Sequence, residues 1–308
     1  MAGGNYMQHN RRRRRGRKIL GTVAFLLTVF SVAAIICLAM FFHVTEIYVT
    51  GLTGVDPQEI IQVSGIAPGQ NIFAFDSRQV ARVIYDRYPQ MDTVRVRRRL
   101  PTTIEIAVLE TTPALAVAGT ADSYSLLGGN GRVLMHKEGI STEGLPLVLG
   151  VDLRDLPAGT AVTQKELDSQ TRLTAAMVKQ VRSKELDEAA LAAQQDYTQR
   201  LYSAVTKLTV AAHLIEAAHQ SQLEKVSYYD VADELEVSLL IDNRVLLAFG
   251  TELDLQYKME FALRVLEELE DTFSGTVDLS TAGNNSRVYS RERNIEPLLS
   301  PIYREGYY

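Results

Sequence analysis

The chain has 308 residues, enough for roughly two domains, and its 46% hydrophobic content is ordinary for a globular protein. It contains no tryptophan and only 7% aromatic residues, which argues against a carbohydrate-binding cleft lined with stacking rings. The net charge of −5 is unevenly placed: residues 1–18 contribute +7 and residues 19–42 contribute nothing, so residues 43–308 carry −12.

An apolar stretch at residues 19–42 organises the rest of the chain. It contains no charged residue and no proline, and as a helix it would be about 36 Å long, against a hydrocarbon core of about 30 Å. We therefore predict a single membrane-spanning helix. The basic residues before it predict a cytoplasmic amino-terminus and an extracytoplasmic location for residues 43–308.

Three other interpretations of this amino-terminus stay open. A cleavable signal peptide has an apolar run of about 7–15 residues and a small-residue cleavage site, whereas bulky residues occupy 38–44. A lipoprotein needs small residues before Cys37, where Ile35 and Ile36 stand. The arginine run could bind nucleic acid, but a neighbouring membrane explains it more simply, because each basic residue gains about 1 kcal/mol at an anionic leaflet. Since Cys37 is the only cysteine, the outer part holds no disulfide, which fits a bacterial envelope.

Residues 43–111 carry the pattern of a small α+β domain. Asp or Ser precedes each helical run and Gly or Pro ends it, while the last two strands show strict alternation and are joined by a tight turn. The expected elements are a strand over 47–50, a helix from Asp56-Pro57 to Gly65, a helix from Asp76 or Ser77 to Pro89, and strands over 94–97 and 104–108.

A set of short motifs accompanies this β-α-α-β-β order: residues 47–51, 69–73, 88–96 and 100–106, then Glu110 with Pro113-Ala114. With them, the segment resembles a POTRA domain, and more narrowly the POTRA domain of the FtsQ/DivIB cell-division proteins. One departure is Thr111-Thr112, where the family usually places a basic residue after the glutamate.

A basic stripe lies on the first strand of the predicted hairpin, at Arg95, Arg97, Arg98 and Arg99. It could meet lipid phosphate or an acidic partner. A solvated strand face is the simpler explanation.

A second hairpin is predicted near the start of residues 112–293. Strand-like runs at 124–127 and 132–134 flank Gly128-Gly129-Asn130-Gly131, and Asn-Gly between apolar runs is a hairpin signal. A glycine-rich phosphate loop would need a following helix with Lys-Ser/Thr instead. With an extended segment at 145–150, the hairpin fits the β-rich second domain of the FtsQ family, which normally has an acid at the position of Gly128.

A stretch free of glycine and proline runs from Ala161 to Phe249. Apolar residues recur at steps of four from Leu173 to Val181, and at steps of three and four from Leu186 to Ile215, which is long enough for two helices or one broken hairpin. The resemblance implies a single helix here, so we interpret residues 164–205 mostly as an insertion. It is either a self-packed helical arm or a partner-binding coiled coil.

Strands and one further helix follow. Gly250, Lys258 and Leu266, followed by an Asp-Leu strand, again resemble the family. The acidic residues that end the helix are interpreted as solvated rather than metal-binding, and residues 294–308 are expected to be poorly ordered. The expected elements are strands over 226–230, 235–241 and 245–250, a helix over 255–269, and strands over 277–279 and 287–289.

No catalytic constellation is apparent in the sequence. His213 and His219 are six residues apart, so they do not share a helix face as metal ligands at i, i+4 would. There is no Gly-x-Ser-x-Gly elbow and no His-Glu-x-x-His motif. We therefore expect no enzyme activity, no metal site and no cofactor.

The predicted fold class is α+β: a single-pass membrane helix, a β-α-α-β-β POTRA domain and a mixed β-sheet domain with amphipathic helices. The predicted segments are a cytoplasmic basic tail at 1–18, the membrane helix at 19–42, the POTRA domain at 43–111, the β domain at 112–293 with a helical insertion around 164–205, and a disordered tail at 294–308.

The resemblance implies a non-enzymatic scaffold of the division machinery, at the septal cell membrane. Family members bind bitopic coiled-coil proteins of the FtsB/DivIC and FtsL type, and so recruit and regulate septal peptidoglycan synthesis. Those proteins and membrane lipid are the expected partners, with no nucleic acid. In the family the last strand of the β domain binds the partner, because a peptide can add to a sheet edge by main-chain bonds. The matching residues are Thr276, Val277, Asp278, Leu279, Arg287, Val288 and Tyr289.

Two other function classes stay as alternatives. A POTRA-type chaperone or protein-translocation factor of the envelope would bind unfolded clients. An envelope enzyme, such as a cell-wall hydrolase, would show activity in a zymogram.

Overall fold

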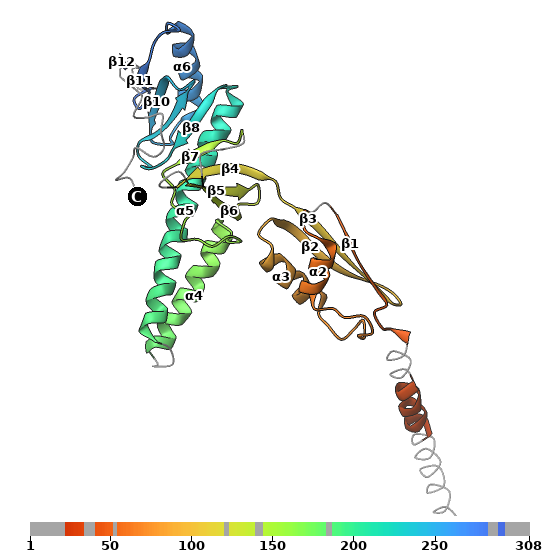
Figure 1. Cartoon of the computed structure of the whole chain (residues 1–308). Coiled ribbons are helices and arrows are strands. Elements are labelled where there is room, and N and C mark those ends of the chain that lie inside the picture. Colours follow the sequence, from red (N-terminus) through yellow and green to blue (C-terminus); the bar gives the residue numbers. More distant parts are fainter. Residues whose placement is uncertain are drawn as a thin grey trace, which may run out of the picture. The chain divides into compact units, whose positions relative to one another are not determined.

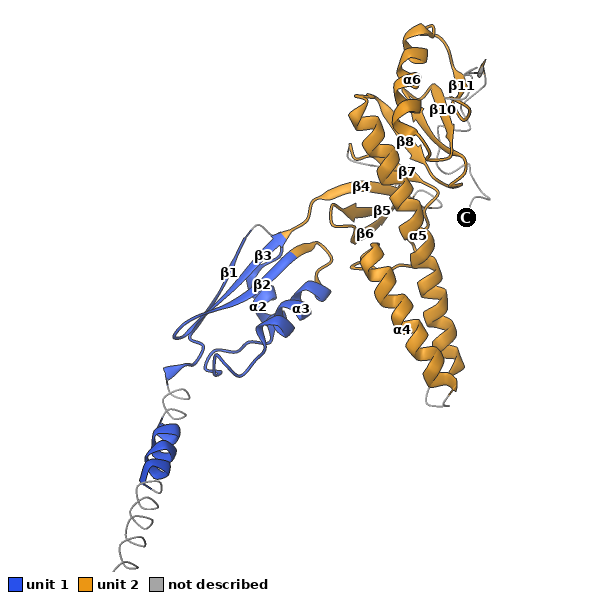
Figure 2. Ribbon diagram, turned by 180° about the vertical axis from the view of Figure 1, so that it is seen from behind, with its two compact units in different colours: residues 1–87, 93–109 blue, residues 88–92, 110–308 orange. Residues whose placement is uncertain are grey.

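The computed structural model describes residues 22–33, 41–51, 54–119, 123–138, 144–182, 187–282 and 289–292. The chain divides into two compact units (Figure 2). One comprises residues 1–87 and 93–109, and the other comprises residues 88–92 and 110–308. The short segment 88–92 therefore belongs with the second unit, although its neighbours on both sides belong to the first.

After residue 42, the described part of the first unit contains a three-stranded sheet with the strand order β1-β3-β2, and two helices. β1 runs parallel to β3, from Glu46 opposite Thr103 to Thr50 opposite Ala107. The predicted β-α-α-β-β order is confirmed. The elements are β1 (Glu46–Thr50), α2 (Pro57–Ser64), α3 (Ser77–Arg87), β2 (Met91–Arg99) and β3 (Thr103–Glu110).

Both helices of this unit begin after an aspartate that satisfies an otherwise unpaired backbone donor. The side chain of Asp56 accepts a hydrogen bond from the N–H of Gln58, and Asp76 accepts one from Arg78, each at 2.9 Å. α2 ends at Gly65, whose φ of 66° is left-handed and suits glycine. The helices cover one face of the sheet, and the fully buried core side chains include Ile60, Ile72, Ile84, Ile104 and Ile106.

The predicted membrane segment is described only in part. Residues 22–33 form a helix, and residues 41 and 42 lead into the first unit. Within the described ranges, no helix combines the length and the apolar character needed to cross a membrane. The other residues of 19–42, the basic tail at 1–18 and the tail at 294–308 lie outside the described residues.

The second unit is built on a nine-stranded mixed sheet with the order β12-β11-β10-β9-β8-β7-β4-β5-β6. Three neighbouring pairs are parallel: β4 with β7, β7 with β8, and β10 with β11. The strands are β4 (Pro113–Ala118), β5 (Ser123–Gly128), β6 (Val133–Glu138), β7 (Leu147–Leu149), β8 (Val226–Asp230), β9 (Val237–Ile241), β10 (Val245–Gly250), β11 (Gly275–Asp278) and β12 (Tyr289–Glu292).

Three helices accompany this sheet: α4 (Gln164–Arg182), α5 (Glu188–Gln220) and α6 (Leu255–Glu268). The carboxyl-terminal half of α5 packs its apolar face on the sheet, and α6 packs beside it. The core that they share contains alternate residues of the central strands, such as Leu239, Leu247 and Val277, together with Leu214 of α5 and Met259 of α6.

The first half of α5 leaves the sheet and packs along α4 as a two-helix arm (Figure 1). The predicted helical stretch is therefore two helices. Their contact is partly polar, because Thr174 and Thr198 share a hydrogen bond of 3.0 Å and the amide of Gln194 donates to Gln170 at 2.9 Å. Leu167 and Leu201 are the buried residues at the base of the arm, where it meets the sheet.

The hairpin predicted at 128–131 is confirmed, because its turn joins β5 to the antiparallel β6. Two other elements differ from the prediction. β4 was not predicted, because its run of small residues behind a proline lacks the alternation of a half-buried strand. β9 begins at Val237, two residues later than predicted, since Asp233 accepts from the N–H of Leu235 and turns the chain there.

Candidate partner-binding edge

The two outer strands of the large sheet are β12 and β6. Within the described ranges, no strand pairs with the outer side of β12. An edge strand of this kind presents unpaired N–H and C=O groups that another chain can bond.

The opposite edge, β6, is partly covered by its own chain. The N–H of Val133 donates to the carbonyl of Thr160 at 2.9 Å, and the N–H of Gly159 donates to Val133 at 2.7 Å. The buried guanidinium of Arg132 holds this segment in place by donating to the carbonyl oxygens of Gly159, at 2.8 Å, and Met91, at 3.3 Å. β12 is therefore the more open of the two edges in the described part of the chain.

β12 lies unusually close to β11. It pairs antiparallel with β11, from Gly275 opposite Glu292 to Asp278 opposite Tyr289. A Cβ atom on Gly275 would lie only 2.1 Å from the carbonyl oxygen of Arg291, so no other residue type fits without moving the strand. On its other side, the N–H of Gly275 donates to the carbonyl of Arg244 at 2.9 Å.

Of the five predicted binding residues that the structure describes, one lies on the open strand. Thr276, Val277 and Asp278 belong to β11, which is paired with β10 on one side and β12 on the other, so they support the edge from one strand inward. Val277 and Leu279 are fully buried in the core. Tyr289 begins β12, and Arg287 and Val288 lie outside the described residues.

The sequence reasoning missed Ser290, Arg291 and Glu292, which make up the rest of β12. Their polar sequence has no apolar alternation, and β12 buries little on its own. The one usable signal was Gly275, since a glycine inside a strand often marks a close backbone approach.

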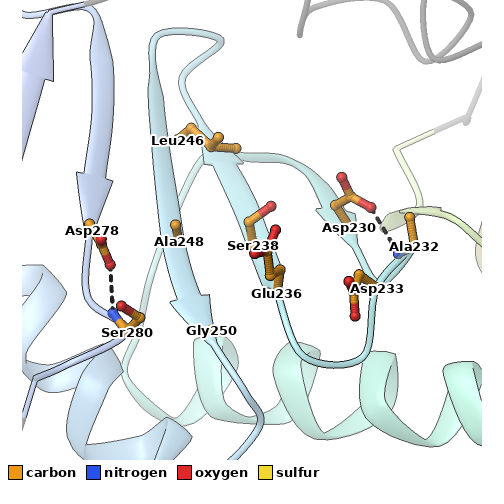
Figure 3. A pocket seen from close by; sticks show the side chains of 10 residues that line it. All are labelled: Asp230, Ala232, Asp233, Glu236, Ser238, Leu246, Ala248, Gly250, Asp278 and Ser280. Carbon is orange, nitrogen blue, oxygen red and sulfur yellow. Dashed lines mark hydrogen bonds between the residues drawn. The ribbon is translucent and has the colours of Figure 1, made fainter. Parts of the chain in front are cut away.

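A cleft of about 290 Å³ lies next to this edge, at the ends of β8, β9, β10 and β11 (Figure 3). Asp230 is buried and accepts a hydrogen bond from the N–H of Ala232 at 3.0 Å, and Asp278 accepts one from Ser280 at 2.9 Å. Both are Asx turns that end a strand, so these carboxylates have a structural role. The acidic residues of the cleft are Asp230, Asp233, Glu236 and Asp278.

Lys258, which the family resemblance singled out, also has a structural role. It is buried, and its ammonium group donates to the carbonyl oxygens of Phe249, at 2.8 Å, and Thr251, at 3.1 Å. Burial lowers the pKa of Lys258, although the carboxylate of Asp254 opposes the shift. The side chain ties α6 to the end of β10. In the ranges that the structure describes, no group of three or more His, Cys, Asp or Glu residues could hold a metal ion.

Comparison with known families agrees with the fold of the first unit. Residues 42–111 match the family model described as "POTRA domain, FtsQ-type". These residues form a POTRA domain of the FtsQ type. The sequence predicted a POTRA domain over 43–111.

Curated relatives extend this similarity beyond the POTRA domain. The cell division protein FtsQ of Corynebacterium glutamicum is 30% identical over 142 residues, which are 46% of this chain and 54% of that protein. FtsQ of Syntrophotalea carbinolica is 31% identical over 160 residues, 50% of this chain and 55% of that protein. The cell division protein DivIB of Clostridium acetobutylicum is 27% identical over 148 residues, 47% of this chain and 58% of that protein. The chain spans about half the length of the curated relatives it matches.

Proposed function

We propose that this protein is a non-enzymatic, membrane-anchored scaffold of bacterial cell division. Its FtsQ-type POTRA domain and its similarity to proteins named FtsQ and DivIB support a role in division. The protein helps to recruit and regulate septal peptidoglycan synthesis by holding other division proteins in place.

The scaffold is anchored by residues 19–42, with its amino-terminus in the cytoplasm and residues 43–308 outside. The uncharged, proline-free composition of that stretch and the seven basic residues before it support this orientation. A fluorescent fusion of the full chain is expected at mid-cell during division. A uniform membrane signal would argue against the proposal.

The outer side of β12 binds the partner by strand addition. The observation that carries this proposal is that β12 ends the sheet, with no described strand on its outer side. Bitopic coiled-coil proteins of the FtsB/DivIC and FtsL type are the partners, and a segment of their outer part pairs with β12. Main-chain hydrogen bonds supply affinity in this mode of recognition, while side-chain positions along the edge supply specificity.

Proline substitution in β12 tests the strand addition. Successive residues of an edge strand turn their N–H groups alternately inward and outward, and proline has no N–H. Ser290→Pro and Arg291→Pro are therefore made as a pair in the full chain, with Glu138→Pro on β6 as the control. Binding to a DivIC-type ectodomain is measured by titration calorimetry.

We expect both β12 variants to lose binding and Glu138→Pro to retain it. The variant whose N–H points outward should also keep the exchange protection of β11, because its pairing inside the sheet is intact. Wild-type affinity in both β12 variants would rule out this edge as the binding site.

A further inference from the structure

The residues that lead into the POTRA domain are bonded to two of its loops. The N–H of Ile72 donates to the carbonyl of Phe42 at 2.9 Å, and the N–H of Val44 donates to Gln70 at 2.7 Å. The N–H of Thr45 donates to the carbonyl of Thr102, in the β2–β3 turn, at 2.8 Å. We call this part of the domain the proximal end: residues 41–45, 70–75 and 98–102.

The proximal end exposes large apolar side chains from all three of its segments. Phe41 is 65% exposed, Phe73 50% and Leu100 58%. The rings of Phe42 and Phe73 are in contact, with centroids 5.5 Å apart, so the loop after α2 continues the apolar surface of the incoming chain. Single apolar side chains scattered over a surface are normal, whereas exposed aromatic and aliphatic groups gathered at one place indicate a contact surface.

A fixed basic group stands within this apolar surface. Arg98 donates from Nε to the carbonyl oxygen of Ile72 at 2.7 Å and from a terminal nitrogen to the carbonyl of Phe75. Its guanidinium carbon lies 5.2 Å from the ring centroid of Phe75 and 6.0 Å from that of Phe73. A guanidinium has five N–H donors, and the bonds to these two carbonyl oxygens within the described residues use two of them, so others can reach an anionic oxygen. Its neighbour Arg99, by contrast, is paired with Glu105 at 2.9 Å.

We propose that the proximal end lies in the headgroup layer of the membrane, with Arg98 at the lipid phosphates. This rests on the proposed anchoring by residues 19–42, because a chain that leaves the bilayer at Phe42 brings everything bonded to residues 42–45 to the membrane surface. Long basic side chains favour that layer, because their stem is apolar and their head is charged. Exposed Phe and Leu side chains insert at the boundary between the headgroups and the acyl chains. The docking partner is thus the outer leaflet of the membrane that the protein's own helix spans.

The far end of the same sheet serves as an internal reference. β3 begins beside the proximal end at Thr103, and Leu109, six residues further along, is 48% exposed. At about 3.3 Å per residue, Leu109 lies about 20 Å from the proximal end. It is as apolar as Leu100 but is placed away from the proposed membrane contact.

The absence of tryptophan from the chain allows a direct test. Single tryptophans are introduced as Phe73→Trp, Leu100→Trp, Leu109→Trp and Phe25→Trp in the full chain. Each variant is reconstituted into nanodiscs of phosphatidylcholine and phosphatidylglycerol, with or without lipids brominated near the glycerol backbone. Phe25→Trp, about six residues inside the predicted span, is also measured with lipids brominated along the acyl chain. Bromine quenches only nearby tryptophan, so tryptophans within the interfacial layer should lose at least about half of their fluorescence.

We expect quenching for Phe73→Trp, Leu100→Trp and Phe25→Trp, and little for Leu109→Trp. If Phe25→Trp is quenched but the two proximal variants respond no more than Leu109→Trp, the inference is overturned while the membrane anchor stands. If Phe25→Trp itself is not quenched, the anchor proposed above fails and this inference fails with it.

A second pair of variants tests the role of Arg98. In the Leu100→Trp background, Arg98→Gln should reduce quenching, whereas Arg264→Gln, on the exposed face of α6, should not. Circular dichroism confirms that both proteins are folded. Equal quenching in the two variants would show that Arg98 does not hold the domain at the phosphates.

Discussion

A single methyl group at Gly275 should detach β12 from the sheet. The Cβ of an alanine would lie 2.1 Å from the carbonyl oxygen of Arg291, whereas real Cβ contacts essentially never fall below 3.0 Å. β12 would therefore have to move by about 0.9 Å, which lengthens an ordinary backbone hydrogen bond beyond its usual range. The ladder between β11 and β12 has four residue pairs.

The cost follows from those pairs. If about four hydrogen bonds are lost at about 0.5–1.5 kcal/mol each, the local stability of the edge falls by about 2–6 kcal/mol. At 1.4 kcal/mol per factor of ten, exchange of those amides of residues 289–292 that face β11 should accelerate by about 30-fold or more. Global unfolding should change much less, because β12 is an edge strand and the core residues stay in place.

Hydrogen–deuterium exchange of Gly275→Ala measures this effect, and titration with a DivIC-type ectodomain measures its consequence for binding. Gly129→Ala is the matched control, because the nearest atom to its Cβ would be the Ala114 methyl at 4.0 Å. Wild-type exchange at residues 289–292 in Gly275→Ala would refute the reasoning that this close approach holds the edge.

Three further predictions concern charged side chains. Burial lowers the pKa of Lys258, so at pH values just below its ordinary pKa of 10.5 the unfolded chain binds more protons than the folded chain. The free energy of unfolding therefore rises with pH in this range. Lys258→Met should lack this rise in urea titrations. Arg99→Gln should raise the pKa of Glu105, seen by carboxyl NMR, because the hydrogen bond from Arg99 lowers it. Arg132→Met should cost about 2–5 kcal/mol in urea unfolding, since two carbonyl oxygens lose their donor, whereas the exposed Arg264→Met should cost less than about 0.5 kcal/mol.

Local patterns were sufficient for the POTRA domain. Capping aspartates, ending glycines and strict alternation are read within a few residues, and the elements that they predicted are present in the predicted order. The strand pairing of the second unit is not local in this sense. β7 pairs with β8, although α4 and α5 lie between them in the chain. The sequence of neither strand predicts which strand it pairs with.

The candidate site shows the same limit more sharply. The resemblance pointed to residues 276–279 and 287–289, but β11 is covered by β12, and β12 can be recognised as the edge only after the pairing is known. The contacts of Arg98 could not be predicted for the same reason, because the carbonyl groups that it binds lie 23 and 26 residues away in the chain. The four arginines of this strand cannot be told apart in the sequence, but in the fold Arg98 is the one bonded to the carbonyl oxygens of Ile72 and Phe75.

The length of the two-helix arm is not fixed by the packing of the core. Among described residues 168–182 and 187–200 none is fully buried, and the arm adds little to the core beyond the partly buried Tyr197. The 13 residues of α5 before Leu201 reach about 20 Å beyond the sheet. Both helices could gain or lose whole turns together without altering the sheet. The length of the arm can therefore match the distance to any partner that binds its tip.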